Sequence, residues 1–261
     1  MEIASFIDYS RFDIELDNLT HLYVGDEFCE RRLPSYLLLE ELFSRFNHSQ
    51  KKISIVTPYL TNKGIKQLLS IIDWVYTKNF RCEIIINDWA VLEILRNYKD
   101  RFELIAGRLL ISRYFSKFHL HCRLRKFSKT KKKRNFYCFF PESFLDFLKK
   151  NNIFRLEFNS LDHLKATNNQ LFKRGFKSHI YFPFMYLTTS RYCTYPGGHG
   201  TRVNKSIVSC NNECKSLYAV MKNNKFLSEI FVKGNTYFTK ITEKKDRVSA
   251  ASDRIIYNSF I

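Results

Sequence analysis

Apolar residues along the chain fall into short runs that alternate with segments of helical periodicity. Runs of apolar, aromatic and β-branched residues bounded by turn formers are typical of buried strands, and apolar residues that recur every three or four positions are typical of helices. The runs predict strands at residues 20–25, 53–58, 82–87, 102–107, 153–158 and 179–187. The periodic segments predict helices at residues 34–46, 63–75, 90–97, 141–148 and 161–172.

This alternation of strands and helices predicts the fold class. Strands joined by crossover helices form parallel sheets with right-handed connections. Six such strands, and a β-rich segment after Cys214 with a turn at Gly234 and Asn235, predict an α/β fold. We expect a parallel (β/α) barrel-like domain spanning residues 1–261, an incomplete or modified TIM barrel with a C-terminal β-rich appendage. No glycine-rich phosphate loop follows any strand, which counts against a nucleotide-binding Rossmann or P-loop domain.

Composition supports one large folded domain. The chain has 261 residues, of which 45% are hydrophobic and 16% aromatic, so it is not of the disordered class. It has no apolar run of 18 residues, which predicts no transmembrane helix. The acidic N-terminal segment lacks the pattern of a secretory signal. Seven cysteines without such a signal favour reduced thiols and a cytoplasmic location.

The positive charge is concentrated in one part of the chain. The formal net charge is +18, and residues 104–141 contain 11 Lys or Arg and no Asp or Glu. This basic insertion, at about residues 113–135, is centred on the run between Lys129 and Arg134. Such a run can bind the phosphates of RNA, although a solvated surface loop is the simpler interpretation. The tail, at about residues 243–261, begins with polar residues and is expected to be mobile.

Three of the cysteines gather late in the chain. Cys193 follows the last predicted strand, and Cys210 and Cys214 are separated by three residues, which places two sulfurs close enough to share a metal centre. Three thiolates are one short of the usual four, and Cys29, after the first strand, is the candidate for the fourth. Zinc and ordinary buried thiols are alternatives, but zinc favours paired C-x-x-C motifs, whereas scattered cysteines suit an iron–sulfur cluster.

Polar residues at strand ends are candidates for a catalytic site. In alternating βα folds the C-terminal ends of the strands carry the chemistry. Asp88, Arg108 and Glu157 lie at or near such ends. Asp88 can equally be a helix N-cap, and Arg108 can simply pair with Asp88 or Glu157. No G-x-S-x-G or H-E-x-x-H motif is present, so no hydrolase nucleophile can be assigned.

Several of these segments together resemble one family. The segments are YVGDEFCERR at 23–32, INDWAVLEIL at 86–95, IAGRLLIS at 105–112, RLEFNSL at 155–161 and FPFMYLTTSRYC at 182–193. In combination they are similar to the collagenase-like peptidase family U thirty-two, and in particular to its short iron–sulfur branch, which serves ubiquinone biosynthesis. The resemblance spans most of the chain from the first strand to Cys214.

The resemblance implies a barrel-like fold and a 4Fe-4S cluster. Its ligands would be Cys29, Cys193, Cys210 and Cys214. It also implies a role in oxygen-independent hydroxylation, in a heterodimer with a second family member. Relatives that support hydroxylation of RNA bases suggest an alternative, an RNA-modification factor that binds RNA through the basic segment. A peptidase, in the sense of the family name, is the second alternative.

Overall fold

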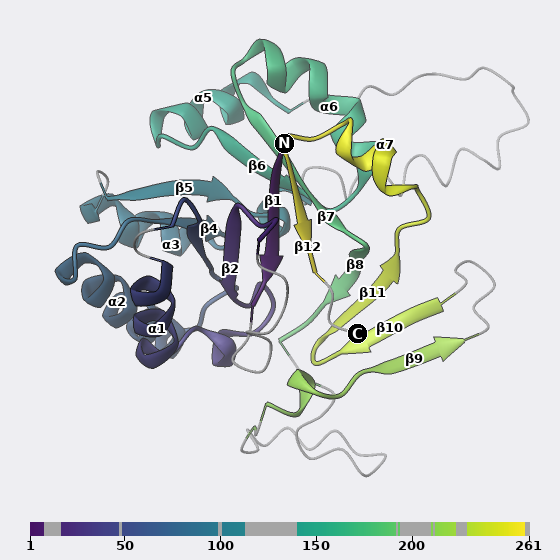
Figure 1. The fold of residues 1–261 in the computed structure, drawn as a ribbon. Coiled ribbons are helices and arrows are strands. Elements are labelled where there is room, and N and C mark those ends of the chain that lie inside the picture. The colour runs from purple at the N-terminus through teal and green to yellow at the C-terminus, as the bar shows by residue number, and fades with distance from the viewer. Residues whose placement is uncertain are drawn as a thin grey trace, which may run out of the picture.

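Eight parallel strands close a barrel in the computed structural model, which describes residues 1–7, 17–46, 49–98, 101–112, 140–191, 193, 210, 212–222 and 229–258. Around the barrel the strands neighbour one another in the order β1, β12, β7, β6, β5, β4, β3, β2, and β2 pairs with β1. Figure 1 shows the barrel surrounded by helices. The strands are β1 (Glu2–Phe6), β2 (His21–Gly25), β3 (Lys52–Val56), β4 (Cys82–Ile86), β5 (Phe102–Ala106), β6 (Arg155–Phe158), β7 (Lys177–Phe182) and β12 (Arg254–Tyr257).

Successive side chains of each strand point alternately outward and inward, and this creates two separate apolar layers. Side chains that point outward pack against the helices and form the main core. Side chains that point inward form a smaller cluster, to which seven of the eight strands each contribute an apolar residue, with Phe6 packed against it. The seven residues are Ala4, Tyr23, Val56, Ile85, Ile105, Tyr181 and Ile256. The inward position of the eighth strand, β6, belongs to Glu157, since Leu156 and Phe158 on either side of it face the outer core.

The helices follow the strands as their sequence signals require. Thr61 caps the N-terminus of α2 by accepting a hydrogen bond from the Gly64 amide, and Asp88 caps α3 by accepting one from Ala90. Residues 108–112 are also helical. The longer helices are α1 (Tyr36–Phe46), α2 (Asn62–Thr77), α3 (Trp89–Leu95), α5 (Glu142–Lys150), α6 (Leu161–Lys173) and α7 (Lys245–Ser249). Short 3-10 helices are η2 (Glu30–Arg32), η3 (Arg96–Tyr98) and η4 (Glu213–Lys215).

The chain forms a second, antiparallel sheet after β7 and before β12 in the sequence. It contains, in spatial order, β8 (Phe184–Thr189), β11 (Thr236–Lys240), β10 (Glu229–Lys233) and β9 (Ala219–Lys222). In Figure 1 it lies to one side of the barrel. Phe184, Phe231 and Phe238 form its small core, and Phe28 and Tyr186 pack against them. Because Phe28 follows β2, this contact joins the sheet to the C-terminal mouth of the barrel.

The structure confirms the predicted α/β barrel with a β-rich appendage, and adds two strands to it. The barrel is closed, because β1 and β12, which the sequence pattern did not indicate, complete it. The strand expected at residues 179–187 is two strands, β7 and β8, on either side of Pro183, and they belong to different sheets. The tail expected to be mobile contains α7 and the closing strand β12. The basic insertion falls outside the described residues.

Within the described ranges, no helix combines the length and the apolar character needed to cross a lipid bilayer.

Candidate metal centre and barrel interior

Four cysteines lie on loops at the junction of the barrel and the second sheet. Cys29 follows β2 and precedes η2 directly, and Cys193 follows β8. Cys214 lies within η4, and Cys210 lies just ahead of it. The turn between them is made by Asn212, which adopts the left-handed conformation with φ of 60°. The sequence-predicted ligands therefore come from three separate places in the fold.

The structure brings these thiols together. A Cβ atom added to Gly234 would lie 3.7 Å from Cys214 Sγ and 4.0 Å from Cys193 Sγ, so both sulfurs face one point beside the β10–β11 turn. Cys210 and Cys214 are close enough to Cys29 for their charges to raise its pKa. Cys193 and Cys210 act on the pKa of Cys214 in the same way. Cys193 and Cys214 thus face one point, and Cys29 and Cys210 lie within electrostatic range of Cys214.

The turn between β10 and β11 holds two of the cysteine-bearing segments in place. Asn235 Nδ2 donates hydrogen bonds to the Phe28 carbonyl, at 2.7 Å, and to the Ser190 carbonyl. These carbonyls precede Cys29 by one residue and Cys193 by three. Gly234 has φ of +61°, a conformation that favours glycine, and its missing side chain leaves the space beside the sulfurs open. The hairpin turn therefore connects the segments that carry Cys29 and Cys193.

Neighbouring groups act on the charge of these thiols. Burial, followed by the negative charge of Asp26, raises the pKa of Cys29 to about 11, and a backbone hydrogen bond from Arg31 opposes this rise. The Asn212 amide donates to Cys210 Sγ in the same manner, at 3.4 Å. Burial also raises the pKa of Cys214, whereas the guanidinium of Arg32 lowers it. The amides and Arg32 are the groups that would stabilise thiolates bound to a cation.

The arrangement does not match the site of a single metal ion. Among the residues that the structure describes, no group of three or more His, Cys, Asp or Glu side chains is placed to hold one ion. Four thiolates on one zinc must all lie about 2.3 Å from it. In a 4Fe-4S cluster each thiolate binds a different iron, so the sulfurs lie further apart. Of the two geometries, only the second lets the four sulfurs lie apart from one another.

Arg108 lies at the C-terminal mouth of the barrel, completely buried. Its Nε and Nη2 atoms donate to both carboxylate oxygens of Glu27, at 2.9 and 2.7 Å, and Nη1 donates to Asn159 and to the Phe184 carbonyl. Its guanidinium carbon lies 3.6 Å from the centre of the Tyr181 ring. Arg108 therefore pairs with Glu27 instead of the expected Asp88 or Glu157, and this pair ties the barrel to the second sheet.

The other two candidate residues have separate surroundings. Asp88 uses one carboxylate oxygen to cap α3 and the other to accept a hydrogen bond from the Leu60 amide at 3.1 Å, so its carboxylate has a structural role. Glu157 lies inside the barrel, where it accepts hydrogen bonds from Tyr23, at 2.8 Å, and Tyr181, at 2.6 Å. Asp88, Arg108 and Glu157 thus do not converge on one catalytic site.

Some residues of the site were not expected from the sequence. Glu27 pairs with Arg108 across 81 positions, a contact with no local signal. Asn235 was expected only as a turn residue, and its hydrogen bonds go to backbone carbonyls, which leave no trace in the side-chain pattern. Cys82 packs in the outer core, as expected from its place in a strand. Cys122, Cys138, His199 and the run from Lys129 to Arg134 lie outside the described residues.

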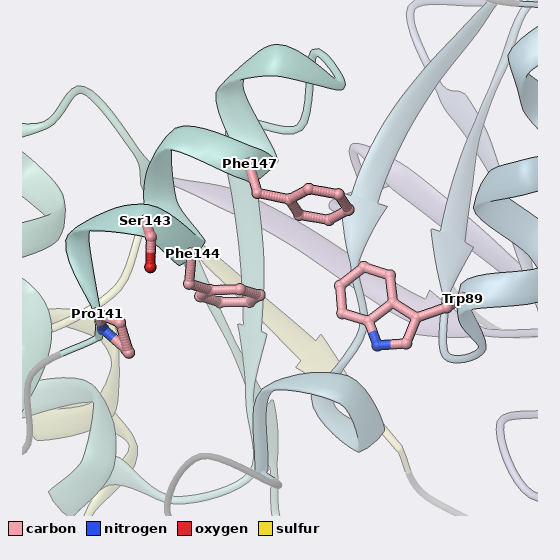
Figure 2. Close-up of a pocket in the computed structure, with 5 residues that line it drawn as sticks. All are labelled: Trp89, Pro141, Ser143, Phe144 and Phe147. Atoms are coloured by element: carbon pink, nitrogen blue, oxygen red, sulfur yellow. The ribbon is translucent and has the colours of Figure 1, made fainter.

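A cavity of about 430 Å³ lies away from these groups, on the outside of the barrel. Figure 2 shows Trp89, at the start of α3, reaching toward Phe144 and Phe147 on α5. The Trp89 and Phe147 rings meet edge to face, with centroids 5.5 Å apart. Pro141 and Ser143 complete the lining. It contains no charged or metal-binding side chain, and we attach more weight to the thiol group as the functional site.

Comparison of the chain with protein-family models, curated proteins and solved structures finds no match.

Proposed function

We propose that the chain binds a 4Fe-4S cluster through Cys29, Cys193, Cys210 and Cys214. We further propose that it takes part in oxygen-independent hydroxylation, as an iron–sulfur component of ubiquinone biosynthesis. The pathway rests on the resemblance of five sequence segments to one branch of the peptidase family U thirty-two. The cofactor rests on that resemblance and on the placement of the cysteines.

The convergence of the four thiols is the observation that carries the proposal. Cysteines from β2, β8 and η4 are far apart in the sequence, and random burial would scatter them. Instead, Cys193 and Cys214 face the same open point beside Gly234, and Cys29 and Cys210 lie close to Cys214. The cysteines are scattered along the chain and form no C-x-x-C pair, which favours a cluster over a single zinc ion.

The surrounding residues would each have a defined part in holding the cluster. The Arg31 and Asn212 amides would donate to thiolate sulfurs, and hydrogen bonds of this kind tune the reduction potential of iron–sulfur centres. Arg32, held by Asp26 at 2.9 Å, would offset negative charge next to Cys214. When bound, the cluster would supply one-electron transfer. The residues of the chain would hold the cluster in position and set its electrostatic surroundings.

The resemblance also supplies the proposed partner. A second member of the same family would form a heterodimer with this chain and complete the hydroxylating system. Co-purification with candidate family members would identify this partner.

Metal analysis after anaerobic purification tests the cofactor. We expect roughly four irons and four sulfides per chain, with the absorption of an iron–sulfur cluster. Each of Cys29→Ala, Cys193→Ala, Cys210→Ala and Cys214→Ala should lower the iron content sharply. Cys82→Ala is the matched control, because Cys82 is a buried thiol of the outer core, and it should keep the iron. A colourless protein, or one zinc per chain without sulfide, would overturn the cluster.

The concentration of positive charge in the basic insertion keeps RNA modification as the second candidate function. Residues 104–141, which include this insertion, contain 11 basic and no acidic residues and can neutralise several phosphates. Salt-dependent RNA binding that is lost when Lys131, Lys132, Lys133 and Arg134 are neutralised would favour this function over ubiquinone biosynthesis. A peptidase would need Cys29 or Cys193 as its nucleophile, in competition with the ligand role, and metal-independent cleavage of a peptide would favour it.

A further inference from the structure

Glu157 is a carboxyl group in the interior of the barrel. It is completely buried, and the other seven strands place apolar residues in the inner cluster. An ionised carboxylate in such surroundings is strongly disfavoured unless a cation pairs with it. The state of Glu157 therefore depends on whether a cation nearby is available.

The cations around Glu157 are already engaged by other carboxylates. Arg108 binds Glu27 through two hydrogen bonds, and Arg254 binds Glu83 through two more, at 2.7 and 2.8 Å. No Lys or Arg within the described residues donates a hydrogen bond to Glu157, whose donors are two tyrosine hydroxyls. The titratable or charged groups around it are Tyr23, Glu27, Arg108, Arg155, His179, Tyr181 and Arg254. Arg155 is itself paired with Glu2 and Glu103.

His179 does not supply the missing charge. Burial and the positive charge of Arg254 hold the pKa of His179 well below its ordinary value, so the imidazole is neutral. Arg155 donates to its Nε2 atom, which leaves the ring proton on Nδ1. Nδ1 lies 4.0 Å from the Glu157 carboxylate and has no hydrogen-bond partner. A neutral ring at this distance does not compensate a buried charge.

We propose that Glu157 carries a proton at neutral pH and is a proton-donor site of the barrel interior, coupled to the hydroxyl of Tyr181. In the protonated state the Glu157 carboxyl donates to the Tyr181 oxygen, and the Tyr181 hydroxyl donates to Glu27. When Glu157 loses the proton, the Tyr181 hydroxyl turns to donate to the new carboxylate. The proton that Glu157 loses in this step passes to bulk water, and no electron is transferred.

The electrostatics agree with this arrangement. Burial raises the pKa of Glu157 to about 8, and the charge of Glu27 adds to the rise, whereas the hydrogen bonds from Tyr181 and Tyr23 oppose it. Burial raises the pKa of Glu27, and Arg108 and then a hydrogen bond from the Tyr181 hydroxyl oppose that rise. Since one hydroxyl has one proton, Tyr181 can donate to only one of the two carboxyl groups at a time. The inference goes beyond the proposed function and does not depend on a bound cluster.

Infrared spectroscopy of the purified full-length chain tests the proposal directly. A protonated carboxyl group has a C=O stretching band that is separate from carboxylate absorption and shifts in heavy water. We expect this band in the wild type at pH 7, its loss in Glu157→Gln, and its disappearance in the wild type as the pH passes about 8. Tyr181→Phe removes a hydrogen bond that lowers the pKa of Glu157, so the band should then persist to higher pH.

Glu93→Gln is the matched control, because Glu93 is an exposed carboxylate on α3, and the band should survive in it. Absence of the band from the wild type at pH 7 would overturn the proposal, and so would a band that survives in Glu157→Gln. If Glu157→Gln does not fold, the pH titration of the band in the wild type and in Tyr181→Phe decides, since both should show it at pH 7.

Discussion

Asn235 joins two of the cysteine-bearing segments by itself. Its side-chain amide donates to the carbonyls of Phe28 and Ser190, one residue before Cys29 and three before Cys193. Residues that orient metal ligands affect affinity without touching the metal, and their loss commonly lowers metal affinity by about 10-fold to 100-fold. A single side chain in a hairpin turn therefore contributes to the assembly of the proposed centre.

We predict that Asn235→Ala lowers iron affinity by about 10-fold or more while the barrel remains folded. Competition with a chelator under anaerobic conditions measures the affinity, and circular dichroism reports the fold. Asn151→Ala is the control, because Asn151 makes the same kind of bond, at 2.8 Å to the Phe147 carbonyl, on the exposed end of α5. Equal iron affinity in both variants would show that the hydrogen bonds of Asn235 do not contribute to metal binding.

The ligands could be anticipated from sequence, whereas the residues that position them could not. Cys210 and Cys214 are close in sequence, and the resemblance points to Cys29 and Cys193. Glu27 and Arg108 gave no such signal, because a carboxylate and a guanidinium 81 positions apart meet only when the barrel closes. Glu157 was noted as a mouth residue, but its place inside the barrel depends on the inward direction of β6, which the short run RLEF does not reveal.

At the level of elements, β12 closes the barrel through both its backbone and Arg254. The strand pairs with β1 and β7, and the side chain of Arg254 is completely buried. Its guanidinium donates to Glu83 on β4, to Glu2 on β1 at 2.7 Å, and to the Tyr23 hydroxyl on β2. One side chain thus connects the last strand with three others.

Replacement of Arg254 by Met should destabilise the protein by about 3–5 kcal/mol, because it leaves the buried Glu83 carboxylate without its cation. Urea denaturation measures the change in the free energy of unfolding. Arg96→Met breaks an exposed pair with Glu93 and should cost no more than about 0.5 kcal/mol. A similar small effect of both substitutions would mean that Arg254 does not hold the barrel closed.

The two strands that sequence analysis missed are those at the ends of the chain. β1 and β12 have five and four residues, and each begins with a charged residue that points into the barrel. Their lengths do not set them apart, since β2 to β5 also have five residues and β6 has four, but no predicted helix follows either of them. Their pairing joins residues more than 250 positions apart. By contrast, β2 to β6 were found because each is apolar and is followed by its own helix, while Pro183 divides what reads as one strand into β7 and β8.

For the whole molecule, two buried carboxyl groups change the free energy of unfolding with pH in opposite directions. Hydrogen bonds from His21 and Arg254 outweigh the cost of burial and lower the pKa of Glu83, so its contribution is present above the ordinary Glu value of about 4.3 and is lost in acid. Glu157 has a pKa raised to about 8. Between about pH 4.3 and pH 8 the folded state keeps a proton on Glu157 that the unfolded state has lost.

The Glu157 contribution to stability therefore falls as the pH rises through this window, by up to about 1.4 kcal/mol per pH unit. Burial and the charge of Arg254 hold the pKa of His179 well below its ordinary value, so below about pH 6.5 the unfolded state binds a proton there that the folded state lacks, which offsets the fall. We therefore expect the free energy of unfolding, measured in urea at pH 5, 6, 7 and 8, to decline mainly above about pH 6.5. Glu157→Gln keeps the shape of the side chain but cannot ionise, so its stability should decline less steeply and exceed the wild type most clearly at pH 8. Parallel declines in the two proteins would place the titrating group elsewhere, and Glu83 could not account for them, since its contribution is constant above about pH 5.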